Sequence, residues 1–74
     1  MNTVAIHTAT IELYKLLKLA GLSASGGDAK MAVAAGQVKV NGETETRKRK
    51  QISPGDVVEV NGQSWQVLAE GRAV

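Results

Sequence analysis

The stretch "GQVKVNG", Gly36 to Gly42, marks the point in the chain where the hydrophobic period changes from that of a helix to that of a strand. Val38 and Val40 alternate with polar residues, which is typical of a strand with one buried face. Asn41-Gly42 then supplies the strongest short signal for a hairpin turn. We therefore expect helices before this stretch and antiparallel strands after it.

The residues before Gly36 predict two short helices. In the first, residues 11–20 read "IELYKLLKLA", and the apolar residues recur at the i, i+3, i+4 and i+7 spacing of an amphipathic helix. Thr10 is the expected N-cap and Gly21 the expected stop. Lys15 and Lys18 fall opposite the apolar stripe, so both should face solvent.

The second helix should begin at "SGGDAK", residues 25–30. Ser25 is the expected N-cap, because Asp28 three residues later completes a capping box. Ala29 and Val33 share one face of this helix and should pack against the first helix. Gly36 ends the helical pattern.

After the Asn41-Gly42 turn, the sequence predicts further strands at 57–60 and 64–68, separated by a second Asn-Gly turn at 61–62. Two helices followed by several antiparallel strands indicate an α+β fold, with a two-helix unit packed on a small, mainly antiparallel sheet. We expect a single domain at 10–69, a flexible N-terminal segment at 1–9 and a C-terminal tail at 70–74.

Composition restricts the classes of function. The chain of 74 residues contains no cysteine and no phenylalanine, so Trp65 and Tyr14 are more valuable to the core than to a ligand. No export signal or membrane-spanning run is apparent, which favours a cytoplasmic protein that does not bind membranes. His7 lacks neighbours at a metal-ligand spacing, and no catalytic constellation is visible. We expect neither a metal, a cofactor nor enzymatic activity.

Charge is distributed unevenly along the chain. Eight of the nine Lys and Arg residues lie in 1–50 against four acids, giving +4, whereas 51–74 has one Arg against three acids, giving −2. Four of the cations are adjacent in "TRKRKQ", residues 46–51, and residues 41–51 contain no aliphatic or aromatic side chain. If residues 43–50 are extended, cations project from both faces, so this segment should be an edge or an exposed ribbon.

The ordered set of motifs from Glu12 to Val60 resembles the RNA-binding domain first known from ribosomal small-subunit protein four, often called the αL motif. The family pattern has leucines, glycines and a serine in the helical unit, then Gly-x-Val-x-Val-Asn-Gly and Pro-Gly-Asp. The matching positions are Leu13, Leu17, Gly21, Ser25, Ala29, Val33, Gly36, Val38, Val40, Asn41, Gly42, Pro54, Gly55 and Asp56. The chain looks like the small stand-alone bacterial members of this family.

The resemblance implies a compact domain that binds structured RNA, usually ribosomal or transfer RNA, through a basic surface on the helices and the adjoining hairpin. We also expect the protein to be a monomer. The residues expected to contact RNA are Lys15, Lys18, Lys30, Lys39, Arg47, Lys48, Arg49 and Lys50. Glu12 and Gly26 stand where the family often has cationic residues. Arg47 to Lys50 should therefore carry more of the contact than in a typical relative.

Several of these residues are compatible with more than one role. The same ribbon could meet an acidic protein partner, or the chain could be an accessory subunit of an RNA-modifying enzyme; the ribosome and the RNA-modification machinery are possible partners. Lys15 and Lys18 could serve only solubility, with Glu12 and Lys15 forming an i, i+3 pair. The Gly26-Gly27 pair could admit an RNA backbone to the helix start, or allow tight helix packing, which we favour slightly.

Overall fold

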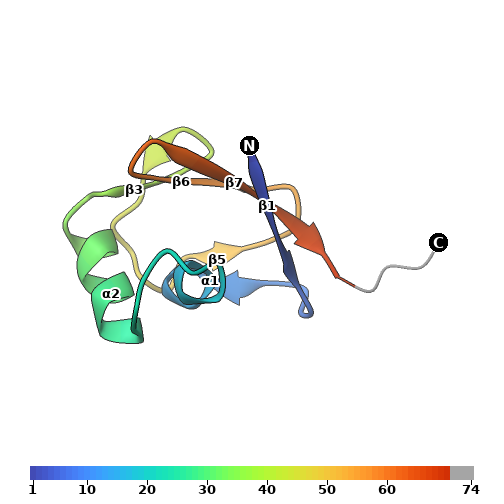
Figure 1. The fold of residues 1–74 in the computed structure, drawn as a ribbon, viewed down its shortest axis with the longest axis horizontal. Coiled ribbons are helices and arrows are strands. Elements are labelled where there is room, and N and C mark those ends of the chain that lie inside the picture. The colour runs from blue at the N-terminus through green and yellow to red at the C-terminus, as the bar shows by residue number, and fades with distance from the viewer. Residues whose placement is uncertain (71–74) are drawn as a thin grey trace.

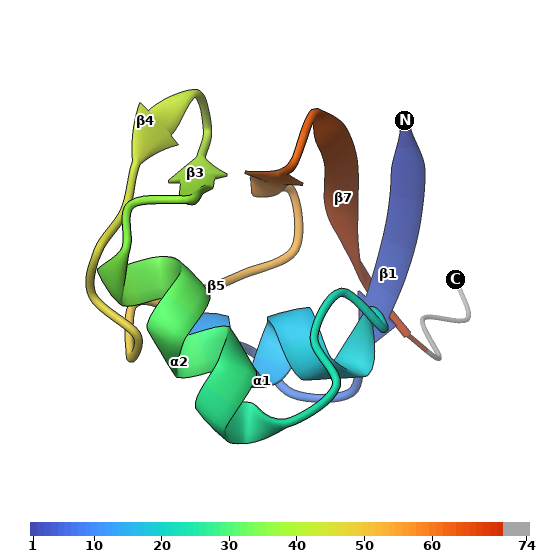
Figure 2. The same ribbon diagram turned by 60° about the vertical axis from the view of Figure 1, so that its left-hand side comes forward.

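The computed structural model describes residues 1–70, in which a five-stranded sheet forms one layer and two short helices form the other (Figures 1 and 2). The elements in chain order are β1 (Asn2–Ile6), β2 (Ile11–Glu12), α1 (Leu13–Leu19), α2 (Gly26–Ala34), β3 (Val38–Val40), β4 (Glu43–Thr44), β5 (Gln51–Ile52), β6 (Val57–Val60) and β7 (Gln63–Ala69). The strand order of the main sheet is β1-β7-β6-β3-β4, and β2 pairs separately with β5. This architecture confirms the predicted α+β fold.

The sheet is built around the two predicted Asn-Gly turns. Asn41 and Asn61 both have a φ of 52°, followed by φ values of 86° at Gly42 and 78° at Gly62. Two consecutive positive φ values are the requirement of the tight hairpin turns that match strand twist, which accounts for both Asn-Gly pairs. The turns set the antiparallel pairing of β3 with β4 and of β6 with β7.

The start of the second helix matches the prediction, whereas that of the first does not. The Ser25 hydroxyl accepts a hydrogen bond from the Asp28 amide at 3.1 Å. Helix α1, however, begins at Leu13 instead of residue 11, because Ile11–Glu12 pairs with Gln51–Ile52. The Thr10 hydroxyl consequently donates to Gln51 Oε1 at 2.7 Å and does not cap the helix.

The N-terminus differs most from expectation. We expected residues 1–9 to be a flexible segment outside the domain, but Asn2–Ile6 forms β1, which pairs in parallel with β7 and closes one edge of the sheet (Figure 1). Val4 and Ile6 are buried in the core. The pairing joins two segments that are far apart in the sequence, so no local sequence pattern predicts it.

The core lies between the sheet and the helices and is entirely aliphatic among its buried members. Those residues are Val4, Ile6, Leu13, Leu16, Leu17, Ala29, Val33, Val38, Val40, Ile52, Val58, Val60 and Val67. Trp65 on β7 packs against this cluster from the sheet side, as predicted, and Tyr14 on α1 packs against it while remaining partly exposed. Neither helix within residues 1–70 is long and apolar enough to cross a membrane.

Candidate functional site

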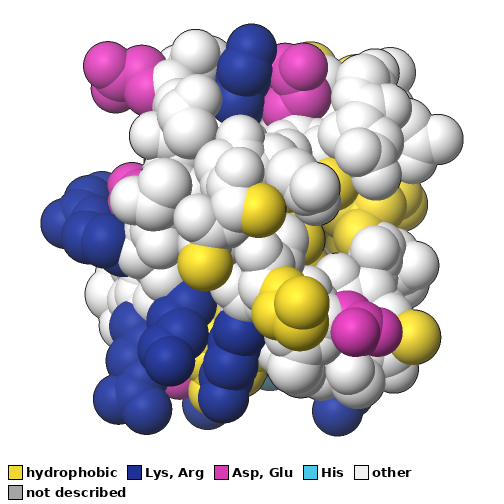
Figure 3. Space-filling model, turned by 90° about the vertical axis from the view of Figure 1, so that its left-hand side faces the viewer, with side chains coloured by type: hydrophobic (Ala, Val, Ile, Leu, Met, Phe, Trp, Pro, Cys, Tyr) yellow, Lys and Arg dark blue, Asp and Glu magenta, His cyan; other side chains and the backbone are white. Residues whose placement is uncertain are grey.

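Three of the predicted cations project from the two helices on the side away from the sheet. Lys15 and Lys18 are exposed on α1, and Lys30 on α2 is half-buried. In Figure 3, Lys and Arg side chains gather at the lower left of the molecule, whereas acidic side chains lie at the top, with a cation between them, and at the lower right. Arg49 lies beside them through a contact with Glu12, and we call Lys15, Lys18, Lys30 and Arg49 together the helix face.

Tyr14 holds two of these lysines together. The Nζ atom of Lys30 lies 4.9 Å from the centre of the Tyr14 ring, and that of Lys15 lies 5.9 Å from it. Both distances fall in the range of cation–π contacts. Tyr14 therefore brings a lysine from each helix to one place on the surface.

Glu12 connects the helices to the basic segment. Its carboxylate lies 3.1 Å from Lys15 Nζ, which confirms the expected i, i+3 pair, and 3.7 Å from Arg49 Nε. The hydrogen bond with Glu12 raises the pKa of Lys15, so that lysine stays protonated at neutral pH. Arg49 thus lies beside the lysines of α1, although it is far from them in sequence.

The segment that carries Arg49 is not an extended ribbon throughout. Glu43–Thr44 forms the edge strand β4, as an edge was predicted, but residues 45–50 form a loop that lies against the start of α1. The carbonyls of Lys50 and Lys48 accept hydrogen bonds from the amides of Leu13 and Tyr14 at 2.9 and 3.0 Å. These bonds satisfy two amides at the start of α1 that have no partner within the helix, and the loop follows this path instead of continuing the strand.

Residues 47–50 therefore do not show the alternation of side chains between two faces that an extended strand would have. That alternation would place Arg47 and Arg49 on one side, but Arg49 lies near Glu12 while Arg47 binds Glu45, with Nε to Oε2 at 2.9 Å and Nη2 to Oε1 at 3.1 Å. The hydrogen bonds from Arg47 lower the pKa of Glu45 to about 2. The pair therefore stays ionised at any pH at which an RNA complex would be studied.

Arg47 also shares a second groove with Lys50, beside the hairpin of β3 and β4. Its volume is about 290 Å³, and its lining residues are Val40, Asn41, Glu43, Thr44, Glu45, Arg47 and Lys50. Two acids line this groove, so its charge is more balanced than that of the helix face. Lys48 lies in the same loop and is exposed.

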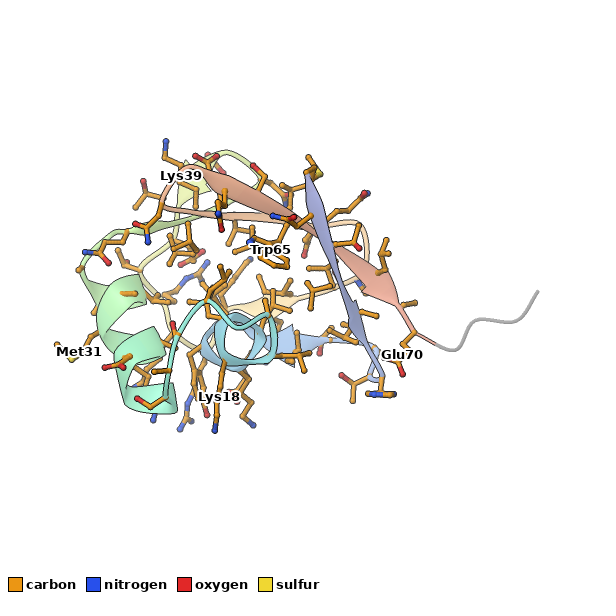
Figure 4. All side chains as sticks on the ribbon, viewed as in Figure 1. Lys18, Met31, Lys39, Trp65 and Glu70 are labelled. Carbon is orange, nitrogen blue, oxygen red and sulfur yellow. The ribbon has the colours of Figure 1, made fainter. Side chains whose placement is uncertain are left out.

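Lys39 does not join the other predicted cations. It lies on β3 with its side chain exposed between the buried Val38 and Val40, so it points away from the core and the helices. Figure 4 shows Lys39 on the outer side of the sheet and Lys18 on the opposite side of the molecule. The structure thus separates one predicted site residue from the rest.

A larger open groove crosses the helix face next to Tyr14. Its volume is about 650 Å³, and it is lined by Ile11, Tyr14, Lys15, Lys18, Leu19 and Gly26. The tight packing that we favoured for Gly26 and Gly27 is wrong: a Cβ atom at Gly26 would meet no heavy atom within 4 Å, and one at Gly27 only Ser25 Oγ at 3.8 Å. Sequence reasoning did not find this groove, because nothing in the pattern requires Leu19 to be exposed.

Asn41 and Asp56, which both match the family pattern, form hydrogen bonds that stabilise the fold next to the basic loop. Asp56 accepts hydrogen bonds from the Ser53 amide at 2.9 Å and from Asn41 Nδ2 at 3.1 Å. Asn41 Oδ1 in turn accepts from the Val57 amide at 2.9 Å. This network ties the turn after β3 to the start of β6 and fixes where the loop of residues 45–50 departs and returns.

Metal chemistry has no visible basis in residues 1–70. No group of three or more His, Asp or Glu side chains in that range is arranged to hold an ion. His7, which we expected in a mobile segment, has Nε2 3.3 Å from Glu70 Oε1. That contact joins the segments that follow β1 and β7.

Comparison with protein families matches residues 4–68 to the S4 domain. The chain belongs to the S4 domain family. This confirms the resemblance drawn from the helical unit and the Gly-x-Val-x-Val-Asn-Gly segment. The match begins at Val4, so it includes the last three residues of β1.

Two curated relatives of this S4 domain cover most of its length. The "Putative RNA-binding protein YbcJ" of Escherichia coli (strain K12) is 56% identical over 59 residues, which are 80% of this chain and 84% of YbcJ. The "Probable ribosome maturation protein RlbA" of Bacillus subtilis (strain 168) is 41% identical over 68 residues, which are 90% of this chain and 96% of RlbA.

Solved structures show the same S4 architecture. The solution structure of E. coli YbcJ, described as revealing an αL motif involved in RNA binding, has a TM-score of 0.72 and 50% identity, covering 93% of this chain and 89% of YbcJ. The 30S ribosomal protein S4e of Thermoplasma acidophilum has a TM-score of 0.62 and 30% identity, covering 80% of this chain but 31% of S4e. The fold therefore occurs both as a small protein and within a larger one.

Proposed function

We propose that this S4 domain is a non-enzymatic protein that binds structured RNA through its helix face. The observation that carries the proposal is the gathering of Lys15, Lys18, Lys30 and Arg49 on one side of the molecule, around Tyr14 and Glu12. Phosphates present closely spaced negative charge, and each cation that neutralises one adds affinity by releasing counterions. A cluster held in place by the fold loses less side-chain entropy on binding than four independent cations would.

The basic loop extends this surface. Its backbone carbonyls already bind the start of α1, so the side chains of Arg47, Lys48, Arg49 and Lys50 can be replaced without removing those hydrogen bonds. Arg47 and Arg49 offer planar forks to phosphate, each at the cost of weakening an existing contact with Glu45 or Glu12. Lys39 has no place in this interface, because it faces the other side of the sheet.

The relatives indicate which RNA to test first. YbcJ is named for RNA binding and RlbA for ribosome maturation, which favours ribosomal RNA over transfer RNA as the first ligand class. A ribosomal precursor or an assembly intermediate would present folded RNA with exposed backbone. Binding in the cytoplasm as a monomer is part of the same proposal.

Titration of labelled ribosomal RNA fragments and of transfer RNA at several salt concentrations tests the proposal. Affinity should fall as salt rises, and Lys18→Gln should reduce the logarithmic salt slope by about 0.7–0.9, the value expected for one lost phosphate contact. Lys39→Gln is the matched control, because it makes the same change in net charge on the opposite face.

The comparison of Lys18→Gln with Lys39→Gln distinguishes binding through the helix face from binding that depends only on net charge. Equal effects of Lys18→Gln and Lys39→Gln would mean that net charge, not the helix face, determines binding. If neither RNA class binds at low salt, the proposal is wrong, and an acidic protein partner becomes the hypothesis to pursue through nuclease-resistant copurification.

A further inference from the structure

The groove on the helix face includes one apolar side chain, that of Leu19, which the core does not use. Leu19, the last residue of α1, is 54% exposed, whereas Leu13, Leu16 and Leu17 of the same helix form the core. Tyr14 and Ile11 continue the apolar surface from Leu19. Apolar side chains gathered in a hollow are more informative than single exposed ones, because they offer a partner a concave site.

Cations border this apolar surface. Lys15 and Lys18 line the groove itself, and Lys30 Nζ lies 4.9 Å from the centre of the Tyr14 ring. A ligand that fits both features carries a flat apolar part and negative charges on either side of it. One unpaired nucleotide in an RNA chain has this chemistry, since its base has two apolar faces and a phosphate lies on each side of its ribose.

We propose that the groove between Tyr14 and Leu19 receives an unpaired RNA base, with the flanking phosphates bound by Lys15 and Lys18. The proposal rests on the function proposed above and makes it more specific, because it names RNA with an unstacked nucleotide as the preferred ligand over uninterrupted duplex. In a duplex the base faces are covered by their neighbours, so only the cations could contribute.

Gly26 provides the means to close the groove without disturbing the fold. It lines the groove at the start of α2, its φ is not in the positive range, and a Cβ atom there would meet no heavy atom within 4 Å. A leucine at this position should therefore be tolerated and should occupy space that a base would use. Gly27→Leu is the matched control, since Gly27 is exposed and does not line the groove.

The experiment compares two synthetic RNA hairpins with one unpaired position in the stem, occupied by adenosine in one and by an abasic nucleotide in the other. The two RNAs carry the same number of phosphates, so any difference in affinity comes from the base. The native protein should bind the adenosine hairpin about five-fold or more tightly, the lower range for stacking of one base on protein side chains. Fluorescence anisotropy of end-labelled RNA measures both affinities.

The variants must remove this preference and nothing else. The affinities for the adenosine and abasic hairpins should become equal in Gly26→Leu and in Leu19→Ala. They should still differ in the control variants Gly27→Leu and Met31→Ala. Met31 is 72% exposed on α2 (Figure 4) and does not line the groove. Circular dichroism checks that each variant is folded. All of them should retain the salt dependence of the native protein.

The outcomes distinguish this inference from the proposed function. If both hairpins bind with equal affinity and binding weakens with salt, the proposed base site is wrong, but the proposal that RNA binds through the helix face still stands. A preference for adenosine that survives Gly26→Leu and Leu19→Ala also overturns it, because the base would then lie elsewhere. Absence of binding to either hairpin, together with no binding to ribosomal or transfer RNA, rejects both proposals.

Discussion

At the scale of single residues, Asp56 connects the turn after β3 to the segment before β6. Its carboxylate accepts hydrogen bonds from the Ser53 amide and from the Asn41 side chain, and these bonds lower its pKa. A carboxylate whose pKa is lower in the folded state stabilises the fold above its unfolded pKa of about 3.9, and this contribution disappears as pH falls through the folded value. The loss is therefore confined to acidic conditions below about pH 4.

We expect Asp56→Asn to lower the free energy of unfolding by about 1–2 kcal/mol at pH 7, because asparagine supplies one acceptor oxygen where Asp56 supplies two, so either the Ser53 amide or Asn41 Nδ2 loses its acceptor. The variant should also lose less stability than the native protein between pH 5 and pH 3. Urea unfolding at both pH values measures this. Glu45, whose pKa is also low, remains in both proteins, so their difference isolates Asp56.

A variant with an unchanged pH dependence would show that Asp56 does not contribute through its charge. Glu43→Gln, which alters an exposed carboxylate on β4, is the control and should leave stability at pH 7 nearly unchanged.

At the scale of the elements, the parallel pairing of β1 with β7 extends the sheet to the first residues of the chain. Ile6 on β1 is 1% exposed and lies opposite Ala69 in the register. We expect Ile6→Ala to lower the free energy of unfolding by about 2–5 kcal/mol and Ile6→Val by about 0.5–1.5 kcal/mol. Urea denaturation measures both.

Thr3 on the same strand is exposed, so Thr3→Ala serves as the control for changes in β1 that do not reach the core. If Ile6→Ala were as stable as Thr3→Ala, β1 would not be part of the folded unit in solution. The same comparison would then favour the flexible segment that the sequence suggested for residues 1–9.

Elements set by local chemistry were predictable from sequence, and those set by distant contacts were not. The Ser25 cap, the Asn-Gly turns and the strands after Gly36 each follow from residues adjacent in the chain, and all are present. By contrast, β1 and the β2–β5 pair each join segments about forty or more residues apart, as Thr10 and Gln51 illustrate. The strands β1, β2 and β5 are too short for their sequences to predict which strand each one pairs with.

The candidate site shows the same division. The sequence indicated Lys15 and Lys18 from helical periodicity and Lys30 from the family resemblance, and the structure brings the three lysines together. The sequence could not show that Arg49 would reach Glu12, because the path of the loop depends on hydrogen bonds that its carbonyls accept from amides of α1. Nor could it place Lys39 on the opposite face, since that depends on which side of the sheet the helices cover.

For the molecule as a whole, the separation of charge between two faces predicts which lysines an RNA would cover. Lys15, Lys18 and Lys30 belong to the helix face, whereas Lys39 lies on the outer side of the sheet near Glu59, its neighbour in the β3–β6 register. We expect bound RNA to protect the first three from acetylation by an amine-reactive ester and to leave Lys39 fully reactive. Mass spectrometry of proteolytic fragments, with and without RNA, measures the reactivity of each lysine.

Protein without RNA supplies the reference reactivity, and a salt concentration high enough to dissociate the complex should restore it for every lysine. Protection of Lys39 equal to that of Lys18 would mean that RNA binds without preference for either face. Protection of Lys48 and Lys50 together with the helix face would instead extend the interface along the basic loop, as the absence of cations at Glu12 and Gly26 leads us to expect.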